Sequence, residues 1–385
     1  MGRLEMLSKS GAVAGGLVLL AFATGAGQPQ QNPDYGFVLT NMGMSFYHGD
    51  DKIDCPAGRS HTLREAYLAT QTPAEQARLL KPENSVEFEK KYKQDYVFNA
   101  RGQDICTNAA AFDTPEHAEQ KILQGKTATG LNLDGAAEGV TAPGTCAHQK
   151  FTSPTGEQGV DNQFYRAIGC NTSWRGLGGG PGDFMGDLHF NDNPTVVIVR
   201  DVQSWENDPH VQVIIAASPD LPSLDATQKV VSGASLHLTD NPRYRLVLNG
   251  RIENGVLTTD PGNLVLPYNW VAASGGELVL NHFRIRAKLN AAGELEGEAG
   301  AYRPLDNAIA TLEVGGPGVA TAAGVDCASV RRTMRTLADG DPDPKTGACT
   351  TISMGLGFGA KPAFIFDKGV LTAAPGGGSI RQAQR

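Results

Sequence analysis

The sequence predicts a mainly β protein: an antiparallel β-sandwich or barrel-like domain that follows a smaller, partly helical region stapled by disulfides. Short runs rich in Val, Ile, Leu and Thr, separated by Asn, Asp, Gly and Pro, fill most of the chain after residue 195. Helix start signals gather between residues 60 and 125. The 40% hydrophobic content is enough to build a core, so the chain is not of the disordered class.

Residues 1–26 have the order of a secretory signal peptide. Arg3 and Lys9 precede the uncharged run Gly11–Ala23, and small residues follow up to Ala26. The run is well short of the roughly 20 residues that span a bilayer. We expect cleavage near Ala23 or Ala26, a periplasmic or secreted protein, and no transmembrane segment in the mature chain; an uncleaved anchor is the alternative.

Residues 27–150 form the expected N-terminal region, polar and irregular up to residue 54. Thr72-Pro73-Ala74-Glu75 is a capping-box pattern, with Pro at the first helical position. The expected helices run from Thr72 through Leu80, from Asn84 or Ser85 through Tyr92, and from Thr114 to Gly125. Residues 126–192 read as loops, and we place the domain boundary near residue 150.

The β domain is expected over residues 151–372, and residues 373–385 form a Gly-rich tail expected to be disordered. A helix is expected at Ala328–Leu337, before a strand pair around Thr351–Phe366. The other strands are expected at Thr195–Val202, Val211–Ala217, Lys229–Leu238, Tyr244–Leu248, Gly255–Thr259, Asn263–Val271, Glu277–Leu289 and Ala308–Val314.

One hairpin is predicted at residue level. Phe283, Ile285, Ala287 and Leu289 alternate with charged residues, so one face of this strand should be buried. Asn290-Ala291-Ala292-Gly293 suits a three-residue loop with Gly in the left-handed position. The register then places Lys288 opposite Glu296 and Arg286 opposite Glu298, so the basic stripe is paired with acidic residues rather than exposed for an anion.

Six cysteines follow the signal peptide, at positions 55, 106, 146, 170, 327 and 349. An even count in an exported protein favours disulfides, although six cysteines allow 15 pairings. Neighbours in sequence would give Cys55–Cys106, Cys146–Cys170 and Cys327–Cys349. The chain has no C-x-x-C, so zinc-ribbon, thioredoxin and c-type haem patterns are absent.

Charge and motif content exclude some functions and leave others open. The net charge of −8 is a poor match to nucleic acid. Asp339, Asp341 and Asp343 are the densest set of oxygen ligands and form the candidate calcium site, although the EF-hand template fails at Pro344 and Thr350. The other candidate set, for a metal or for catalysis, is Asp183, Asp187, His189, Asp192, Glu206 and His210. The chain lacks G-x-S-x-G, S-x-x-K and H-E-x-x-H.

Three segments carry a resemblance. They are Gly130-Leu131-Asn132-Leu133-Asp134-Gly135, Gly159-Val160-Asp161-Asn162-Gln163-Phe164-Tyr165-Arg166 with Gly169-Cys170, and Ile352-Ser353-Met354-Gly355-Leu356-Gly357-Phe358. Together they resemble uncharacterised exported proteins of proteobacteria, a likeness that implies export and no particular activity. Physically, Asp161-Asn162 after Gly159 reads as a tight turn, and a disulfide beside it would make a rigid loop suited to binding.

The function expected from these observations is binding without catalysis, of a small molecule, a carbohydrate or another surface protein. Export, disulfides, β architecture and missing catalytic motifs lead to it. A secreted hydrolase is the first alternative, with Asp187, His189, Glu206 or His210 in a cleft between the N-terminal region and the sheet. A calcium-stabilised structural protein of the cell surface is the second.

Overall fold

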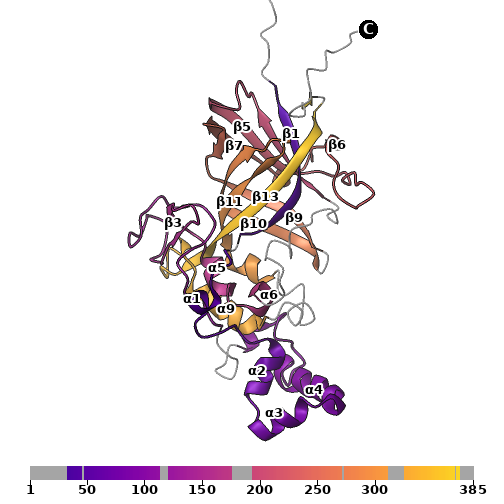
Figure 1. The fold of residues 1–385 in the computed structure, drawn as a ribbon, viewed down its shortest axis with the longest axis vertical. Coiled ribbons are helices and arrows are strands. Elements are labelled where there is room, and N and C mark those ends of the chain that lie inside the picture. The colour runs from indigo at the N-terminus through magenta and orange to yellow at the C-terminus, as the bar shows by residue number, and fades with distance from the viewer. Residues whose placement is uncertain are drawn as a thin grey trace, which may run out of the picture. The chain divides into compact units, whose positions relative to one another are not determined.

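A computed structural model describes residues 33–45, 47–112, 120–175, 193–270, 273–310, 325–368 and 370–372 (Figure 1). The predicted signal peptide, the predicted helix start at Thr114 and the predicted tail lie outside these residues. Helices are α1 (Asp51–Asp54), α2 (Leu63–Ala69), α3 (Pro73–Leu79), α4 (Ser85–Tyr92), α5 (Gln163–Ile168), α6 (Thr172–Arg175) and α9 (Cys327–Thr336), with shorter helical turns at Pro82–Asn84, Lys93–Val97, Ala109–Phe112 and Pro242–Tyr244. Strands are β1 (Tyr35–Met44), β2 (Phe151–Thr152), β3 (Gln158–Val160), β4 (Thr195–Arg200), β5 (Asp208–Ala217), β6 (Ala234–His237), β7 (Arg245–Glu253), β8 (Val256–Thr259), β9 (Gly262–Trp270), β10 (Ala273–Leu289), β11 (Leu295–Pro304), β12 (Gly340–Pro342), β13 (Cys349–Asp367) and β14 (Val370–Leu371).

The main sheet closes on itself, which confirms the mainly β fold and selects the barrel-like form over the sandwich. Its strands pair antiparallel in the order β1, β4, β5, β7, β8, β10, β11 and β13, and β13 pairs again with β1. Closure removes the two free edges that an open sheet of these strands would expose. Four more strands attach outside this ring: β6, β12 and β14 on β13, and β9 on β10.

Strands β1, β4 and β5 are buried on both faces, which explains their nearly continuous runs of apolar residues. Side chains alternate between the faces of a strand. Val197 and Val199 of β4 therefore pack in the large inner core, while Val196 and Ile198 pack in a second apolar cluster on the other face. That second cluster contains Leu236 of β6, which lies beside β13 in Figure 1 and pairs with it in parallel.

The predicted hairpin is confirmed in register. Lys288 pairs with Glu296 and Arg286 with Glu298, and the Arg286 guanidinium donates to Glu298 Oε2 at 2.9 Å. Gly293 has φ +77°, as the loop requires. The basic stripe of β10 is thus partly neutralised by β11.

Helices α5 and α9 pack against one end of the closed sheet. Phe164 and Ile168 of α5, together with Val330 and Met334 of α9, belong to the same core as the inward side chains of the strands. In Figure 1 both helices lie below β11 and β13. Helix α9 occupies Cys327–Thr336, close to the predicted Ala328–Leu337, and Asp326 caps it by accepting from the Ser329 N–H.

Helices α3 and α4 begin where the sequence predicts, whereas α1 and α2 were not predicted. Thr72 caps α3 by accepting from the Glu75 N–H, but the reciprocal bond of a full capping box is absent there, because the Glu75 carboxylate binds Arg78. The complete box is found at α2, between Thr62 and Glu65. Helices α2 and α4 share a small core with Cys106 and Cys327, separate from the sheet core.

All six cysteines form disulfides, but the pairing by sequence neighbours was wrong. The bonds are Cys55–Cys170, Cys106–Cys327 and Cys146–Cys349, which join residues 115, 221 and 203 positions apart. Sequence proximity fails as a guide because each bond fastens a loop or helix of the first half of the chain to a later element. Three disulfides are typical of proteins that fold in an oxidising compartment.

Three local predictions need correction. Residues 35–44, expected to be irregular, form β1, and this strand lies between β4 and β13. Residues 308–310, the start of an expected strand, are helical, and the rest of that strand lies outside the described residues. The expected strand pair at Thr351–Phe366 is the single 19-residue strand β13. The described residues from 33 onward belong to one compact unit, and the boundary expected near residue 150 stays a prediction.

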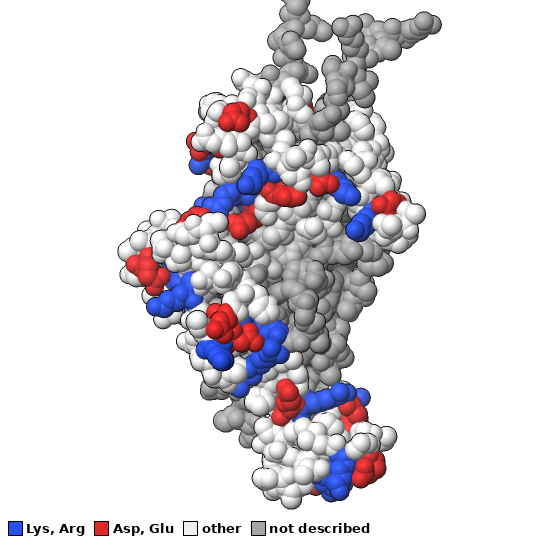
Figure 2. All heavy atoms as spheres, in the orientation of Figure 1, with Lys and Arg blue, Asp and Glu red and all other residues white. Residues whose placement is uncertain are grey.

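Charged side chains of both signs are interspersed on the face that Figure 2 shows, with no extended area of one sign over the coloured residues. Within the described residues, every helix is too short or too polar to serve as a membrane span.

Candidate functional site

The three segments that carry the sequence resemblance meet at one place, beside α5. The Gln163 N–H donates to the Ser353 hydroxyl at 2.9 Å, and the Leu133 N–H donates to Asp161 Oδ2 at 2.7 Å. Gly355 lies where a Cβ would come within 2.8 Å of the Thr129 carbonyl oxygen and 2.9 Å of Asn162 Nδ2. A side chain on Gly355 would therefore push these segments apart.

Asn162 fixes the start of α5 and holds two other segments against it. Its side-chain oxygen caps the helix by accepting from the Tyr165 N–H at 3.1 Å. Its Nδ2 donates to the carbonyl oxygens of Ser45 and Thr129, both at 3.0 Å. Asn162 is fully buried, so these bonds are also needed to satisfy the amide.

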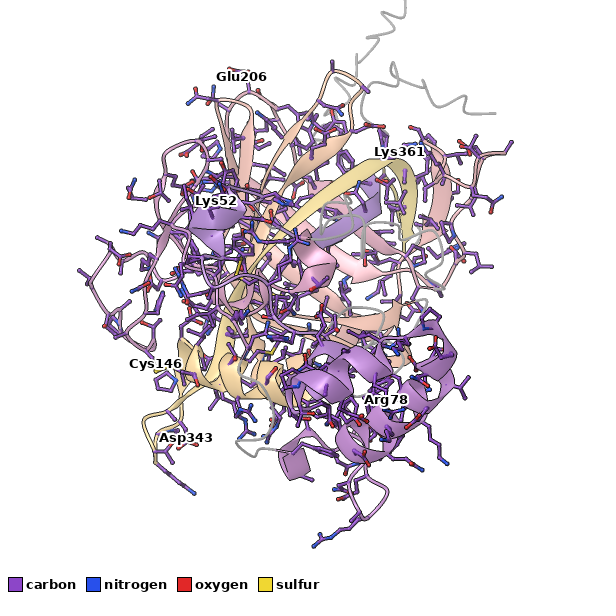
Figure 3. The ribbon with its side chains drawn as sticks, turned by 60° about the horizontal axis from the view of Figure 1, so that its bottom comes forward. Lys52, Arg78, Cys146, Glu206, Asp343 and Lys361 are labelled. Carbon is purple, nitrogen blue, oxygen red and sulfur yellow. A yellow bond between two sulfur atoms is a disulfide. The ribbon has the colours of Figure 1, made fainter. Side chains whose placement is uncertain are left out.

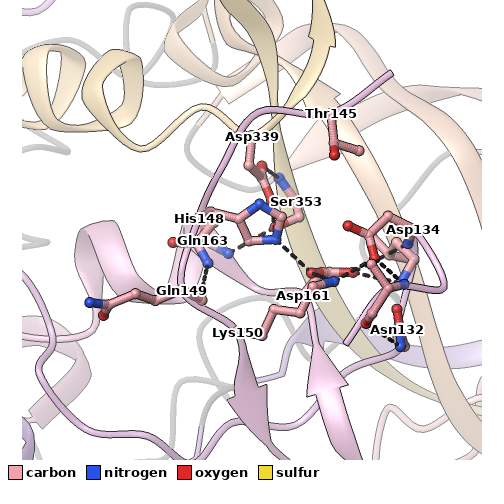
Figure 4. Close-up of polar contacts among 12 residues, drawn as sticks. Asn132, Asp134, Thr145, His148, Gln149, Lys150, Asp161, Gln163, Asp339 and Ser353 are labelled. Carbon is pink, nitrogen blue, oxygen red and sulfur yellow. Dashed lines mark hydrogen bonds and ion pairs between the residues drawn. The ribbon is translucent and has the colours of Figure 1, made fainter. Parts of the chain in front are cut away.

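Asp161 is the centre of a buried network of charges (Figure 4). Its Oδ1 accepts from Lys150 Nζ and lies next to His148 Nε2, both at 2.8 Å. Lys150 Nζ also reaches Asp134 Oδ1 at 2.5 Å. The side chains of Asp134, Lys150 and Asp161 are at most 2% exposed. Each charge in the network is therefore compensated by a partner in contact, as burial requires.

The partners of Asp161 shift its pKa and those of its neighbours. Burial alone would raise the pKa of Asp161, but its hydrogen bonds to His148 and Lys150 lower it below the usual value. Burial would also lower the pKa of His148, yet the bond to Asp161 and the charge of Asp339 raise it. Lys150 follows the same pattern, because Asp134 and Asp161 outweigh burial and raise its pKa.

Asp339 contributes a second carboxylate on the other side of His148. Its Oδ2 lies 3.6 Å from His148 Nε2, and its Oδ1 accepts from the Ser353 N–H at 2.7 Å. Burial raises the pKa of Asp339 to about 6. The backbone of Asp339 also accepts from the Cys146 N–H at 2.9 Å, so this carboxylate and the segment that carries His148 are tied together.

Asp134, His148 and Asp161 have ligand atoms within 4.8 Å of one another, the spacing of a metal site. Two features argue against a metal there. The Lys150 ammonium already bridges Asp134 and Asp161. His148 Nδ1 lies 2.8 Å from the Cys146 carbonyl oxygen, so with Asp161 at Nε2 both ring nitrogens face acceptors and act as donors. These residues fit a buried ion-pair network better than a metal centre.

A pocket of about 240 Å³ opens beside this network, between α5 and the end of α9. Its walls are residues 122–124, 147–149 and 336–338 together with Gln163 and Arg166, and we name it the α5–α9 pocket. Gln124, Ala147 and Thr336 are exposed at its rim, whereas Leu123, Gln163 and Arg166 are buried. His148, whose side chain is 7% exposed, separates the pocket from Asp161 and Asp339.

Arg166 is the buried cation of the pocket wall. Its Nε donates to Gln163 Oε1 at 3.1 Å, its Nη1 to the Leu123 carbonyl at 3.2 Å, and its Nη2 to the Gln149 carbonyl at 3.5 Å. The guanidinium carbon lies 4.1 Å from the centre of the Phe151 ring. Burial lowers the pKa of Arg166 to about 10, although the charge of Glu138 opposes this shift.

The candidate residues predicted from the sequence lie elsewhere. Glu206 and His210 are exposed near the turn before β5, whereas Asp183, Asp187, His189 and Asp192 lie outside the described residues. Figure 3 shows Glu206 at the opposite side of the view from Asp343 and Cys146. Trp205, next to Glu206, packs edge-on against Tyr35 with 5.4 Å between ring centres.

The three aspartates proposed for calcium have separate partners. Asp339 is buried in the network described above, while Asp341 has φ +49° and accepts from Asn281 Nδ2 at 3.1 Å. Asp343 accepts from the N–H groups of Lys345 and Thr346, both at 2.8 Å, and so caps its own turn. The positive φ of Asp341 breaks the alternation that would have placed the three side chains together.

Sequence reasoning selected Asp161 as a turn residue but missed His148, Lys150 and Arg166 as members of one site. The sequence feature that could have led to the site was the resemblance carried by three segments that are distant in sequence. In the structure these segments lie in contact. Family models, characterised proteins and solved structures were all compared with the chain, and none of them matched.

Proposed function

We propose that this protein is exported and binds a small ligand, without catalysis, in the α5–α9 pocket. The observation that carries the proposal is a pocket whose walls come from four parts of the chain and are held in place by covalent and buried polar links. Preformed walls reduce the ordering cost of binding, which is typical of ligand sites.

Three of the four walls have such an anchor. The Cys146–Cys349 disulfide and the bond from Cys146 N–H to the Asp339 carbonyl hold residues 147–149. The Leu123 N–H donates to the Arg166 carbonyl at 2.9 Å, which ties residues 122–124 to α5. Asn162 anchors α5 itself. The resemblance to exported proteins and the three disulfides support a periplasmic or secreted location.

The chemistry of the pocket wall supports binding rather than hydrolysis. Both nitrogens of His148 are engaged by acceptors, so the ring has no free lone pair with which to act as a general base. Among the described residues of the pocket wall no serine or cysteine stands beside a base. No observation favours the calcium-stabilised surface protein, and we propose no second function.

A thermal-shift screen of the mature protein against small polar and aromatic compounds tests the proposal. Ala147→Trp places a large ring at the exposed rim and is expected to abolish any shift seen with the wild type. Ala292→Trp, at the exposed hairpin turn, is the matched control and should leave the shift unchanged. Equal shifts in wild type and Ala147→Trp would show that binding occurs elsewhere.

A further inference from the structure

We infer that the ligand of the α5–α9 pocket carries a carboxylate, and that Arg166 binds it. The inference rests on the proposed function, because it names the class of ligand for that same pocket. It comes from the position of Arg166, a buried guanidinium on the pocket wall whose hydrogen-bond partners among the described residues are all uncharged oxygens.

The contrast with Arg175 shows what is unusual about Arg166. Arg175 is equally buried, and its guanidinium contacts Asp51 at 2.8 Å and Asp54 at 2.6 Å. Within the described part of the chain, Arg166 has no carboxylate at such a distance. A buried charge without a counter-ion in contact is unfavourable, and an anion entering the pocket would relieve that cost.

The donors of Arg166 match a carboxylate in number. A guanidinium carries five N–H groups. The bonds to Gln163, Leu123 and Gln149 use one hydrogen each on Nε, Nη1 and Nη2, so one hydrogen remains on each of Nη1 and Nη2. Two donors on the terminal nitrogens suit the two oxygens of a carboxylate, which arginine binds in this forked manner.

His148 lines the pocket without competing for the ligand, and its charge is compensated by Asp161 and Asp339. Hydrogen bonds to the Cys146 carbonyl and to Asp161 hold both of its nitrogens, and its raised pKa favours the cation. The Lys150 ammonium lies behind it, against Asp161. The groups facing the pocket from residues 122–124 and 336–338 carry no charge, so no acidic side chain there opposes an anion.

The size of the pocket limits the ligand. About 240 Å³ is below the range of about 300–1,000 Å³ typical of drug-sized ligands. The apolar side chains of Ile122, Leu123 and Leu337 form part of the wall beside the polar ones. A small carboxylic acid with a compact apolar or hydroxylated body fits both the volume and the lining.

Pairs of acids and their amides test the inference, because each pair shares a shape and differs in charge. The binding of four acids to the mature protein would be measured by equilibrium dialysis or calorimetry: acetate, lactate, succinate and benzoate. Each acid would be compared with its amide, namely acetamide, lactamide, succinamide or benzamide. Inorganic phosphate would serve as a second kind of anion. We expect at least one acid to bind about tenfold or more tightly than its amide. If acids and amides bind equally, the ligand class is wrong while the pocket function stands. If phosphate binds and no acid does, the carboxylate assignment fails. If nothing in the panel or in the broader screen binds at the pocket, both proposals fail.

Two variants assign the effect to Arg166. Arg166→Gln removes the charge and should abolish the preference for the acid, whereas Arg166→Lys keeps a cation and should retain part of it. Gln163→Glu leaves Arg166 in place but puts a carboxylate where Gln163 Oε1 lies, 3.1 Å from Nε, and should weaken acid binding about tenfold or more. Circular dichroism and intact disulfides establish that each variant is folded. A folded Arg166→Gln that still prefers the acid overturns the inference.

Discussion

Replacing Lys150 by Met tests whether the buried network stabilises the fold. Met keeps most of the length of the side chain but removes the ammonium that contacts Asp134 Oδ1 at 2.5 Å and Asp161 Oδ1 at 2.8 Å. Two buried carboxylates would then share His148 as their nearest cation. Removing one partner of a buried ion pair costs about 3–5 kcal/mol, a large part of the roughly 5–15 kcal/mol by which such proteins are stable.

The assay is urea unfolding of the oxidised protein, followed by circular dichroism and tryptophan fluorescence. We expect Lys150→Met to lower the free energy of unfolding by about 3–5 kcal/mol at pH 7. The double variant Lys150→Met/Asp134→Asn should lose less than the single variant, because it also removes one of the carboxylates left unpaired. Asn at position 134 can still accept from the Ala136 N–H.

Lys91→Met is the matched control, since the Lys91 ammonium contacts Glu75 at 3.1 Å and Glu87 at 3.3 Å on the surface. Exposed pairs of this kind contribute little. A loss for Lys150→Met no larger than that for Lys91→Met would refute the argument from burial. A double variant as unstable as the sum of its two single changes would refute the coupling between Lys150 and Asp134.

The remaining predictions concern pH, packing and the disulfides. The lowered pKa of Asp161 means that its stabilising contribution is lost as the pH falls below its unfolded value of 3.8. The raised pKa of Asp339, about 6, means that its contribution is lost as the pH rises from 3.8 to about 6, and the raised pKa of His148 means that its contribution is lost as the pH rises above 6.5. For these three groups the free energy of unfolding should therefore be highest near about pH 4, and His148→Gln should flatten its decline above pH 6.5. Gly355→Ala should lower the free energy of unfolding in urea by about 1–3 kcal/mol. Gly357→Ala should leave it almost unchanged, because the nearest atom to a Cβ there is 3.8 Å away. Equal effects of the two changes would contradict the close approach at Gly355. Cys146→Ala/Cys349→Ala should weaken ligand binding at the pocket more than Cys106→Ala/Cys327→Ala does, when both variants are measured under conditions where they remain folded. The reverse order would show that the pocket wall does not need its disulfide.

The parts of the fold that the sequence predicts are those governed by neighbouring residues. The 288–296 hairpin is correct in register because a short loop and an alternating pattern fix it. The helix start at Thr72 is correct because its cap is local, whereas the start at Ser85 is correct although the Asn84 side chain makes no capping hydrogen bond. The pairing of β1 with β13 joins residues 319 positions apart, as between Thr40 and Gly359, and no local pattern marks it. The disulfide partners were wrong for the same reason.

The residues of the candidate site also divide into those that the local sequence reveals and those that depend on contacts between distant segments. Asp161 stands in a motif whose turn chemistry is visible in the sequence, and the motif leads to the site. His148 and Lys150 lie in a segment that reads as loop, and their burial depends on contacts with Asp161 and Asp339 from other segments. The feature that distinguishes Arg166 is the lack of a carboxylate partner among the described residues, which only a three-dimensional arrangement reveals.

The position of β13 in the chain has a consequence for synthesis. This strand pairs with β1, β6, β11, β12 and β14, so the ring of strands cannot close until residues 349–367 have emerged. Until then β1 and β11 each lack a neighbour, and Cys106 and Cys146 lack their partners Cys327 and Cys349. A nascent chain in an oxidising compartment would therefore pass through a period with unpaired strand edges and reactive thiols, when a holding chaperone and a disulfide isomerase would have most effect on yield.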